Sequence, residues 1–201
     1  MPRALSQQER ASIQTRLKAE AAQCLQTLGV KKTTVDELVR RVNIPKGTFY
    51  LFYPSKELLF FDVIMELHDE IQGSLITTLQ STAQPLGVET LTAILFDLFK
   101  HIEGSFLATL IQRQDLELLI RKLPPEVITQ HAQTDDLIMD RFLSFLPVQL
   151  DEAQLTIFSA ALRAAFLMIL HTQEVGVDVF DDVMRLMLRG IVSQILEEGK
   201  R

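Results

Sequence analysis

The spacing of apolar residues along this chain constrains its fold more than any other feature. From Gln7 to Leu28, apolar side chains recur every three or four residues, which places them on one face of a helix. Similar spacing continues in later segments, and no segment shows the strict alternation of a half-buried strand. We therefore expect an all-α fold of about nine helices.

Turn-forming and capping residues predict where these helices begin and end. Gly29 is expected to end the first helix, and Thr34 with Glu37 has the spacing of a capping box that starts the second. Pro45 suits the first turn of a third helix, and Ser55 can cap a long fourth one. Further helices are expected over residues 88–103, 105–122, 125–146, 151–173 and 178–198.

The formal net charge of −6 conceals a split along the chain. Residues 1–56 contain ten Lys/Arg and four Asp/Glu, a net charge of +6, whereas residues 57–201 contain ten and 22, a net charge of −12. Because salt screens charges beyond about 8–10 Å, a surface responds mainly to its local charge. A basic N-terminal part can therefore bind DNA, although a chance asymmetry would look the same.

Several functional classes find little support in the sequence. The polar start does not resemble a signal peptide, and no uninterrupted apolar run has the length of a membrane span, so a cytoplasmic protein without a membrane partner is expected. The lone Cys24 excludes an internal disulfide and has the place of a buried structural thiol. No HExxH, GxSxG or glycine-rich phosphate loop is present, so we expect neither an enzyme nor a cofactor.

Two short helices joined by a tight turn are predicted between Thr34 and Tyr50, with Asn43 able to take the left-handed conformation at the turn. This is the size of a DNA-binding helix-turn-helix. The span TTVDELVRRVNIPKGTFYLFYPSKELL resembles the N-terminal motif of the TetR family of transcriptional regulators. The resemblance is close from about residue 10 to residue 60, and beyond that only helix number and length agree.

The resemblance implies two domains and a ligand-controlled function. Residues 1–54 would form a three-helix TetR-type DNA-binding domain, and residues 55–201 a six-helix ligand-binding and dimerisation domain. Such proteins bind an inverted-repeat operator as homodimers and usually repress transcription until a small molecule releases them. Here we expect a largely apolar effector in a cavity of at least roughly 300 Å³. A pure interaction bundle is the alternative, but it would leave the helix-turn-helix motif unexplained.

The third predicted helix is the expected recognition helix. Gly47 lets its backbone approach DNA closely, while Lys46 and Thr48 lie in the first turn, which faces base edges. By resemblance, Tyr50, Lys56 and the hydroxyl of either Thr33 or Thr34 would contact phosphate. The predicted DNA-binding residues are therefore Thr33, Thr34, Lys46, Gly47, Thr48, Tyr50 and Lys56.

One position departs from the family pattern. The family usually has Tyr or His followed by Phe, whereas this chain has Phe52 followed by Tyr53. Phe52 cannot donate to a phosphate. Either the Tyr53 hydroxyl reaches out beside the fourth helix, or one phosphate contact is missing. Packing among the first four helices is the other role open to Phe49, Phe52 and Tyr53.

The last two predicted helices carry apolar faces wide enough for a four-helix dimer interface, with an intramolecular bundle as the alternative. The predicted interface residues are Leu155, Phe158, Leu162, Ala165, Phe180, Val183, Met187, Ile191 and Ile195. On the penultimate helix, Ala160, Ala161, Ala164 and Leu167 form a second side that another helix could approach closely.

By resemblance, the intervening helices would enclose the effector. Candidate lining residues are His68, Ile71, Leu75, Phe96, Phe99, Phe106, Arg113, His131, Met139, Phe142 and Phe166, each of which could equally be plain core. Asp97 with His101 and His131 with Asp135 are spaced like metal ligands, but surface hydrogen bonds explain them as well. No metal site is therefore expected.

Overall fold

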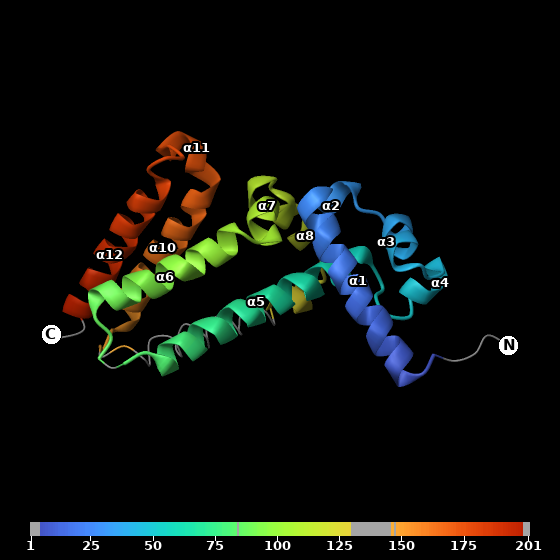
Figure 1. The fold of residues 1–201 in the computed structure, drawn as a ribbon, viewed down its shortest axis with the longest axis horizontal. Coiled ribbons are helices and arrows are strands. Elements are labelled where there is room, and N and C mark those ends of the chain that lie inside the picture. The colour runs from blue at the N-terminus through green and yellow to red at the C-terminus, as the bar shows by residue number, and fades with distance from the viewer. Residues whose placement is uncertain (1–4, 84, 130–145, 147, 199–201) are drawn as a thin grey trace. The chain divides into compact units, whose positions relative to one another are not determined.

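The structure is a computed structural model that describes residues 5–83, 85–129, 146 and 148–198. Within these residues the chain forms helices and turns and no strand, which confirms the all-α prediction (Figure 1). The chain divides into two compact units. The first unit comprises Met1–Asp69 and Ser105–Ile128, and the second comprises Glu70–Gly104 and Thr129–Arg201.

The first unit contains the predicted DNA-binding helices and two later ones. Its helices are α1 (Gln7–Thr27), α2 (Gly29–Lys32), α3 (Val35–Val42), α4 (Lys46–Phe49), the N-terminal part of α5 (Lys56–Ser81), α7 (Phe106–Gln112) and α8 (Asp115–Ile120). α1 packs against α3 and α7. The functional division expected at residue 54 stays a prediction, because the compact units describe packing alone.

Local sequence signals explain where α1 and α3 begin. Ser6 and Glu9 form a complete capping box, with Glu9 N–H donating to Ser6 Oγ (3.2 Å) and Ser6 N–H to the Glu9 carboxylate (2.8 Å). Thr34 caps α3, since its hydroxyl accepts from Glu37 N–H at 3.1 Å. Asn43 ends α3 at φ 55° and ψ 55°, the left-handed conformation predicted for it.

One predicted boundary differs from the structure. α1 stops at Thr27, and Gly29 follows its C-cap in a left-handed conformation (φ +77°), which confirms that this glycine ends the first helix. Gly29 is also the first residue of α2, a short helix that was not predicted. The helix expected over residues 105–122 is broken into α7 and α8, because Gln114 adopts a left-handed conformation (φ 56°). α8 contacts α2, and helical periodicity does not reveal this long-range contact.

The core of the first unit is apolar and lies between α1, α3, α4, α5, α7 and α8. Phe49 is fully buried in it, which confirms core packing for this residue. Burying a Leu or Phe side chain stabilises a fold by about 1.5–3 kcal/mol, so this core holds the short helices α3 and α4 in place. Cys24 is also fully buried, and burial raises the pKa of its thiol, as expected of a structural cysteine.

The second unit contains the C-terminal part of α5, then α6 (Val88–Glu103), α10 (Glu152–Leu167), the 3-10 helix η1 (Met168–His171), α11 (Thr172–Val175) and α12 (Phe180–Glu198). The bounds of α6 match the prediction. The single helix expected over residues 151–173 is instead interrupted by η1. Residues 125–129 are helical, and the rest of the helix predicted to residue 146 lies largely outside the described residues.

α12 packs along α6 and α10 (Figure 1). Aromatic rings from these three helices contact one another. Phe99 is fully buried, with ring centroids 5.9 Å from Phe180, 6.0 Å from Phe166 and 6.3 Å from Phe96. The Arg185 guanidinium lies 3.5 Å from the Phe96 ring centroid. This aromatic cluster is the centre of the second unit's core.

The stretch Glu152–Val175 is long and apolar enough to cross a membrane by length and composition alone, which the search for uninterrupted apolar runs did not detect. Only 17% of its most apolar window is buried. A single such helix is weak support for a membrane span, since helices of soluble proteins pass the same test. Large exposed apolar patches mark sites that contact another protein, a ligand or a membrane.

Candidate nucleic-acid interface

The outer surface of α4 carries the side chains expected of a recognition helix. Phe49 faces the core, whereas Lys46 and Gly47 are exposed. A Cβ added to Gly47 would meet nothing within 4 Å, so this side of the helix is open to an approaching backbone. Tyr50 follows with half of its surface exposed, and its ring meets Phe49 edge-on at 5.3 Å.

Lys46 is held by an acidic side chain of the neighbouring helix. Its ammonium forms an ion pair with Asp36 on α3 at 2.9 Å, and the hydrogen bond from this pair raises the pKa of Lys46. Both side chains are largely exposed, so water and salt screen the pair and little energy is needed to open it. Lys46 is therefore oriented in the free protein and available to another acceptor.

The structure separates the two threonines that were alternatives for a phosphate contact. Thr33 is fully buried, and its hydroxyl donates to the carbonyl of Gly29 at 2.7 Å. Thr34 is exposed at the N-terminus of α3, where its hydroxyl accepts from Glu37 N–H. Only the Thr34 hydroxyl lies at the surface in this conformation.

Lys56 is bound to the main chain of α2 and the residue that follows it. Its Nζ donates to the carbonyl oxygens of Val30 (2.8 Å) and Thr33 (2.5 Å). Burial lowers the pKa of Lys56. Its ammonium has three donors, and these two bonds leave one for a further acceptor.

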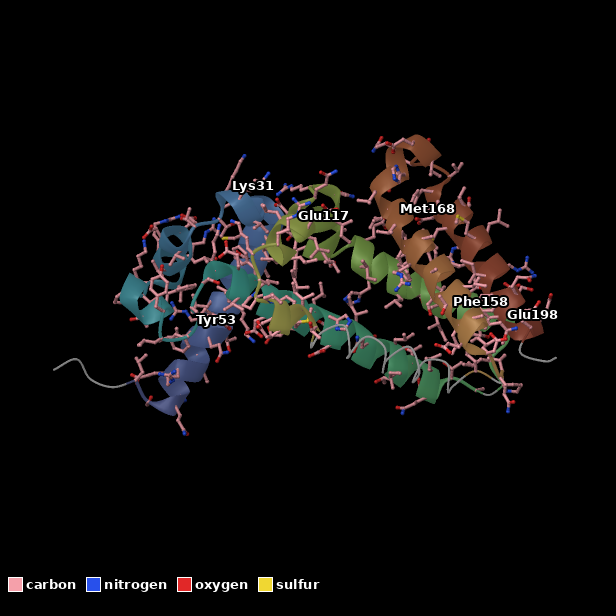
Figure 2. All side chains as sticks on the ribbon, turned by 180° about the vertical axis from the view of Figure 1, so that it is seen from behind. Lys31, Tyr53, Glu117, Phe158, Met168 and Glu198 are labelled. Atoms are coloured by element: carbon pink, nitrogen blue, oxygen red, sulfur yellow. The ribbon has the colours of Figure 1, made fainter. Side chains whose placement is uncertain are left out.

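Phe52 and Tyr53, whose order is reversed relative to the family pattern, lie in different environments. Tyr53 is buried, its hydroxyl donates to Asp62 at 2.6 Å and accepts from Gln14 at 3.3 Å, and burial raises its pKa to about 12 (Figure 2). Phe52 lies at the surface of the core, with the Arg10 guanidinium 5.1 Å from its ring centroid. Neither aromatic side chain therefore presents a hydroxyl to solvent at this point.

Arg40 and Arg41 of α3 both pair with an acidic residue of the same helix. The Glu37 carboxylate accepts from Arg40 at 2.8 Å and from Arg41 at 2.6 Å. These hydrogen bonds lower the pKa of Glu37. Sequence reasoning did not identify the roles of Asp36 and Arg10, because their partners, Lys46 and Phe52, belong to other elements.

The predicted dimer residues divide between the core and the surface of the second unit. Leu162, Ala165, Phe180 and Ile195 are buried within the protomer. Leu155, Phe158, Val183 and Ile191 are half-buried, and Met187 is exposed. The most exposed apolar side chains of α10 and α12 are Ile157, Leu167 and Leu186, at 64%, 51% and 70%. The alanines at 160 and 164 are also exposed.

A hollow of about 200 Å³ lies between α5 and α6 in the second unit. We call it the α5–α6 hollow. Its apolar wall includes the predicted Ile71 and Leu75 together with Ile94 and Leu98, which were not predicted. Its polar lining consists of Ser74, Thr78, Asp97 and His101. The volume is below the roughly 300 Å³ that was expected.

The other predicted lining residues lie elsewhere. Phe96, Phe99 and Phe166 fill the aromatic cluster. In the first unit, Phe106 packs on the core, His68 lies 3.8 Å from Asp69, and Arg113 Nη1 donates to Thr27 O at 3.5 Å. His131, Met139 and Phe142 lie outside the described residues. Where the structure describes the chain, no three potential metal ligands gather.

The part of the chain that contains the helix-turn-helix matches the sequence model of a known protein family. Residues 18–63 match the model of bacterial regulatory proteins of the tetR family. This match assigns a TetR-type N-terminal domain to residues 18–63. A comparison with curated protein sequences gives no significant match.

Solved TetR family structures share the fold along nearly the whole chain. RolR in complex with resorcinol is 21% identical, with a TM-score of 0.57, and the match covers 98% of this chain and 97% of RolR. A TetR/AcrR regulator from Thermobifida fusca is 19% identical, with a TM-score of 0.62 and coverages of 90% and 97%. FadR from Bacillus subtilis in complex with stearoyl-CoA is 14% identical, with a TM-score of 0.60 and coverages of 92% and 98%. These likenesses extend the family's fold to the second unit.

Proposed function

We propose that this regulator is a cytoplasmic homodimer that binds an inverted-repeat operator through α4 and is released by a small molecule. The observation that carries the proposal is the outer surface of α4. Lys46 and Gly47 are exposed there, while Phe49 anchors the helix in the core. A short helix of this kind, fixed from behind and open in front, fits the major groove of DNA.

Within each DNA-binding domain, different residues have different roles. Lys46 and Thr48 contact bases, and Gly47 allows the backbone to come close. Tyr50 and Thr34 contact phosphate, because their hydroxyls lie at the surface, whereas Thr33 supports the α2–α3 junction from inside. Lys56 offers phosphate its remaining donor while holding the main chain. Phosphate contacts fix the register, and base contacts supply the specificity.

Selection of binding sites from a random duplex pool tests these roles. Lys46→Ala should cost about 1–3 kcal/mol and relax specificity at one position of each half-site. Lys56→Ala should weaken binding on every sequence and reduce the salt slope by about 1 per lost phosphate contact. Lys100→Ala, a lysine of α6, is the control and should change neither. If Lys56→Ala alone alters the selected sequence, α4 is not the recognition helix.

Exposed apolar side chains of α10 and α12 support the dimer. Ile157, Leu167 and Leu186 would be covered by a second copy of the same helices, and exposed alanines of α10 allow close approach. Burial of this surface in a dimer also accounts for the apolar stretch Glu152–Val175 without a membrane. Two recognition helices about 34–36 Å apart would then read both halves of an inverted repeat.

The α5–α6 hollow is the proposed effector site. RolR and FadR contain resorcinol and stearoyl-CoA, respectively, and we propose that this chain is also ligand-controlled. The hollow pairs an apolar wall with a few polar groups, so its ligand would combine an apolar body with a hydrogen-bonding group. At about 200 Å³ it accommodates a small ligand or one end of a larger one. In this proposal the DNA-bound protein represses transcription, and the ligand relieves the repression by releasing the operator.

A ligand panel tests this part of the proposal. Small phenols and fatty acids are titrated into the complex of the protein with its selected operator. At least one class should release the DNA, and Leu75→Trp, which fills the hollow, should abolish this response without changing operator affinity. Operator release that persists in Leu75→Trp would place the effector site elsewhere.

A further inference from the structure

A buried carboxylate connects α8 to α2 in the first unit. Asp115 is the first residue of α8, and its side chain is almost fully buried. Its Oδ2 accepts a hydrogen bond from the main-chain N–H of Val30 at 2.9 Å, across 85 positions of sequence. The left-handed turn at Gln114 separates α7 from α8 immediately before it. The break in the predicted helix therefore places an acidic side chain on α2.

The backbone of α2 is shaped to receive this carboxylate. A Cβ added to Gly29 would lie only 2.3 Å from Asp115 Oδ2, so any side chain at this position would displace the acid. Gly29 also has a φ of +77°, a conformation in which other residues are strained. The close approach of Asp115 to α2 therefore requires a glycine at position 29.

The other end of α2 leads directly to the proposed DNA contacts. Lys56 donates to the carbonyls of Val30 and Thr33, and the buried Thr33 hydroxyl donates to Gly29 O. The next residue is Thr34, the N-cap of α3. Val30 therefore links the two charged side chains, since its N–H donates to Asp115 and its carbonyl accepts from Lys56, and α2 leads on to Thr34.

Physical chemistry explains why α2 needs hydrogen-bond partners at both ends. A helix of four residues has no stability of its own in water, so α2 depends on tertiary partners. The carboxylate satisfies an amide near its N-terminus, and the ammonium satisfies carbonyls towards its C-terminal end, which is the favourable arrangement with the helix dipole. Removing the carboxylate would leave a buried N–H without a partner.

We propose that Asp115 is a positioning residue for operator binding, which holds α2 so that Lys56 and Thr34 lie where DNA requires them. Asp115 itself touches no DNA in this proposal. It acts by keeping the binding-competent arrangement populated, and a loss of that population lowers the apparent affinity by the same factor. The inference rests on the proposed operator contacts of α3, α4 and Lys56.

The test measures affinity for the inverted repeat that the wild-type protein selects, at a temperature where each variant is folded. Asp115→Ala should weaken binding about tenfold or more, since a charge-assisted hydrogen bond is lost. Asp115→Asn keeps the shape and an acceptor for Val30 N–H, so it should stay within about threefold of the wild type. Glu117→Ala is the matched control, because Glu117 is an exposed acid of the same helix (Figure 2), and it should have no effect.

A double variant distinguishes positioning from general stability. If Asp115 acts through Lys56, then Asp115→Ala should cost much less in a Lys56→Ala background than in the wild type. Independent, multiplying effects would overturn the proposal, as would a folded Asp115→Ala protein that binds like the wild type. If Asp115→Ala does not fold, Asp115→Asn decides, and a loss beyond tenfold there contradicts the hydrogen-bond argument. A wild-type protein that selects no duplex refutes the proposed function instead.

Discussion

Acidic side chains at the start of α3 form ion pairs with basic side chains near the proposed DNA-binding surface. Asp36 pairs with Lys46, and Glu37 pairs with both Arg40 and Arg41. Asp36 and Glu37 are among the four acids that reduce the ten positive charges of residues 1–56 to a net charge of +6. Because the Asp36–Lys46 pair is exposed, its strength depends on salt. Asp36 also lies next to the proposed phosphate contact at Thr34 and repels DNA there.

Asp36→Asn should therefore strengthen DNA binding. It frees Lys46 and removes a negative charge from the interface, and we expect affinity for any duplex to rise about two- to fivefold at low salt, equivalent to about 0.3–1 kcal/mol. The gain should shrink as salt increases. Fluorescence anisotropy at two salt concentrations measures it, with Glu117→Gln as the control. An unchanged affinity at low salt would contradict this account of the interface.

Tyr53 makes a second prediction at this scale, on alkaline stability. Burial and its bond to Asp62 raise the pKa of Tyr53 to about 12, above its ordinary value near 10. Lys18, which pairs with Asp62 and Glu66, also has its pKa raised to about 12. A raised folded pKa favours the protonated form, so both contributions are complete below pH 10 and are lost as the pH rises towards 12.

Stability should thus fall steeply between pH 10 and 12. Tyr53→Phe should make this fall shallower, although it weakens the fold at neutral pH by about 1 kcal/mol for the lost hydrogen bond. Denaturant melts at several pH values test the slope. Absorbance titration of tyrosinate in a Tyr50→Phe background isolates Tyr53, and a midpoint near 10 would show that the residue is not buried as described.

At the scale of elements, local signals predicted helix existence better than helix interruption. Thr34, Asn43 and Ser55 act through neighbours within four residues, and the structure shows each in its predicted place. The left-handed turn at Gln114 and the bond from Val30 to Asp115 could not be predicted in this way, because Val30 and Asp115 lie 85 positions apart. Sequence separation hides that contact.

Periodicity also left the role of apolar faces undecided. The spacing of Phe96, Phe99 and Phe166 is the same whether they line a cavity or fill it, and the structure shows a filled cluster. Ile94 and Leu98 share a helix face with Asp97 and His101, a signal that could have identified the α5–α6 hollow. Whether such a face lines a cavity or fills the core depends on how the other helices pack against it.

The exposed faces of α10 and α12 carry the prediction for dimerisation. Leu186→Glu should shift the protein from dimer to monomer, because burying an unpaired carboxylate costs several kcal/mol. Leu186 is 70% exposed within the protomer, so the substitution leaves the protomer core intact. Ile120→Glu on α8 is the control, with the same change of chemistry on another exposed apolar residue. Sedimentation measures both, and a wild type that is monomeric at micromolar concentration excludes the interface.

At the scale of the whole molecule, effector and operator must be linked thermodynamically. If an effector lowers operator affinity by a given factor, bound operator lowers effector affinity by the same factor. Calorimetric titration of the effector with and without saturating operator should therefore give matching ratios. Unequal ratios would show that a further species, such as a monomer, takes part in the equilibrium.

At position 47, DNA binding and the stability of the fold favour different residues. Nothing in the fold would meet a Cβ there, and alanine in a helix is more favourable than glycine by about 0.5–1 kcal/mol. Folding alone therefore prefers alanine at this position. A version of this protein optimised only for thermal stability would therefore carry alanine at position 47, and its α4 backbone would lie farther from the DNA.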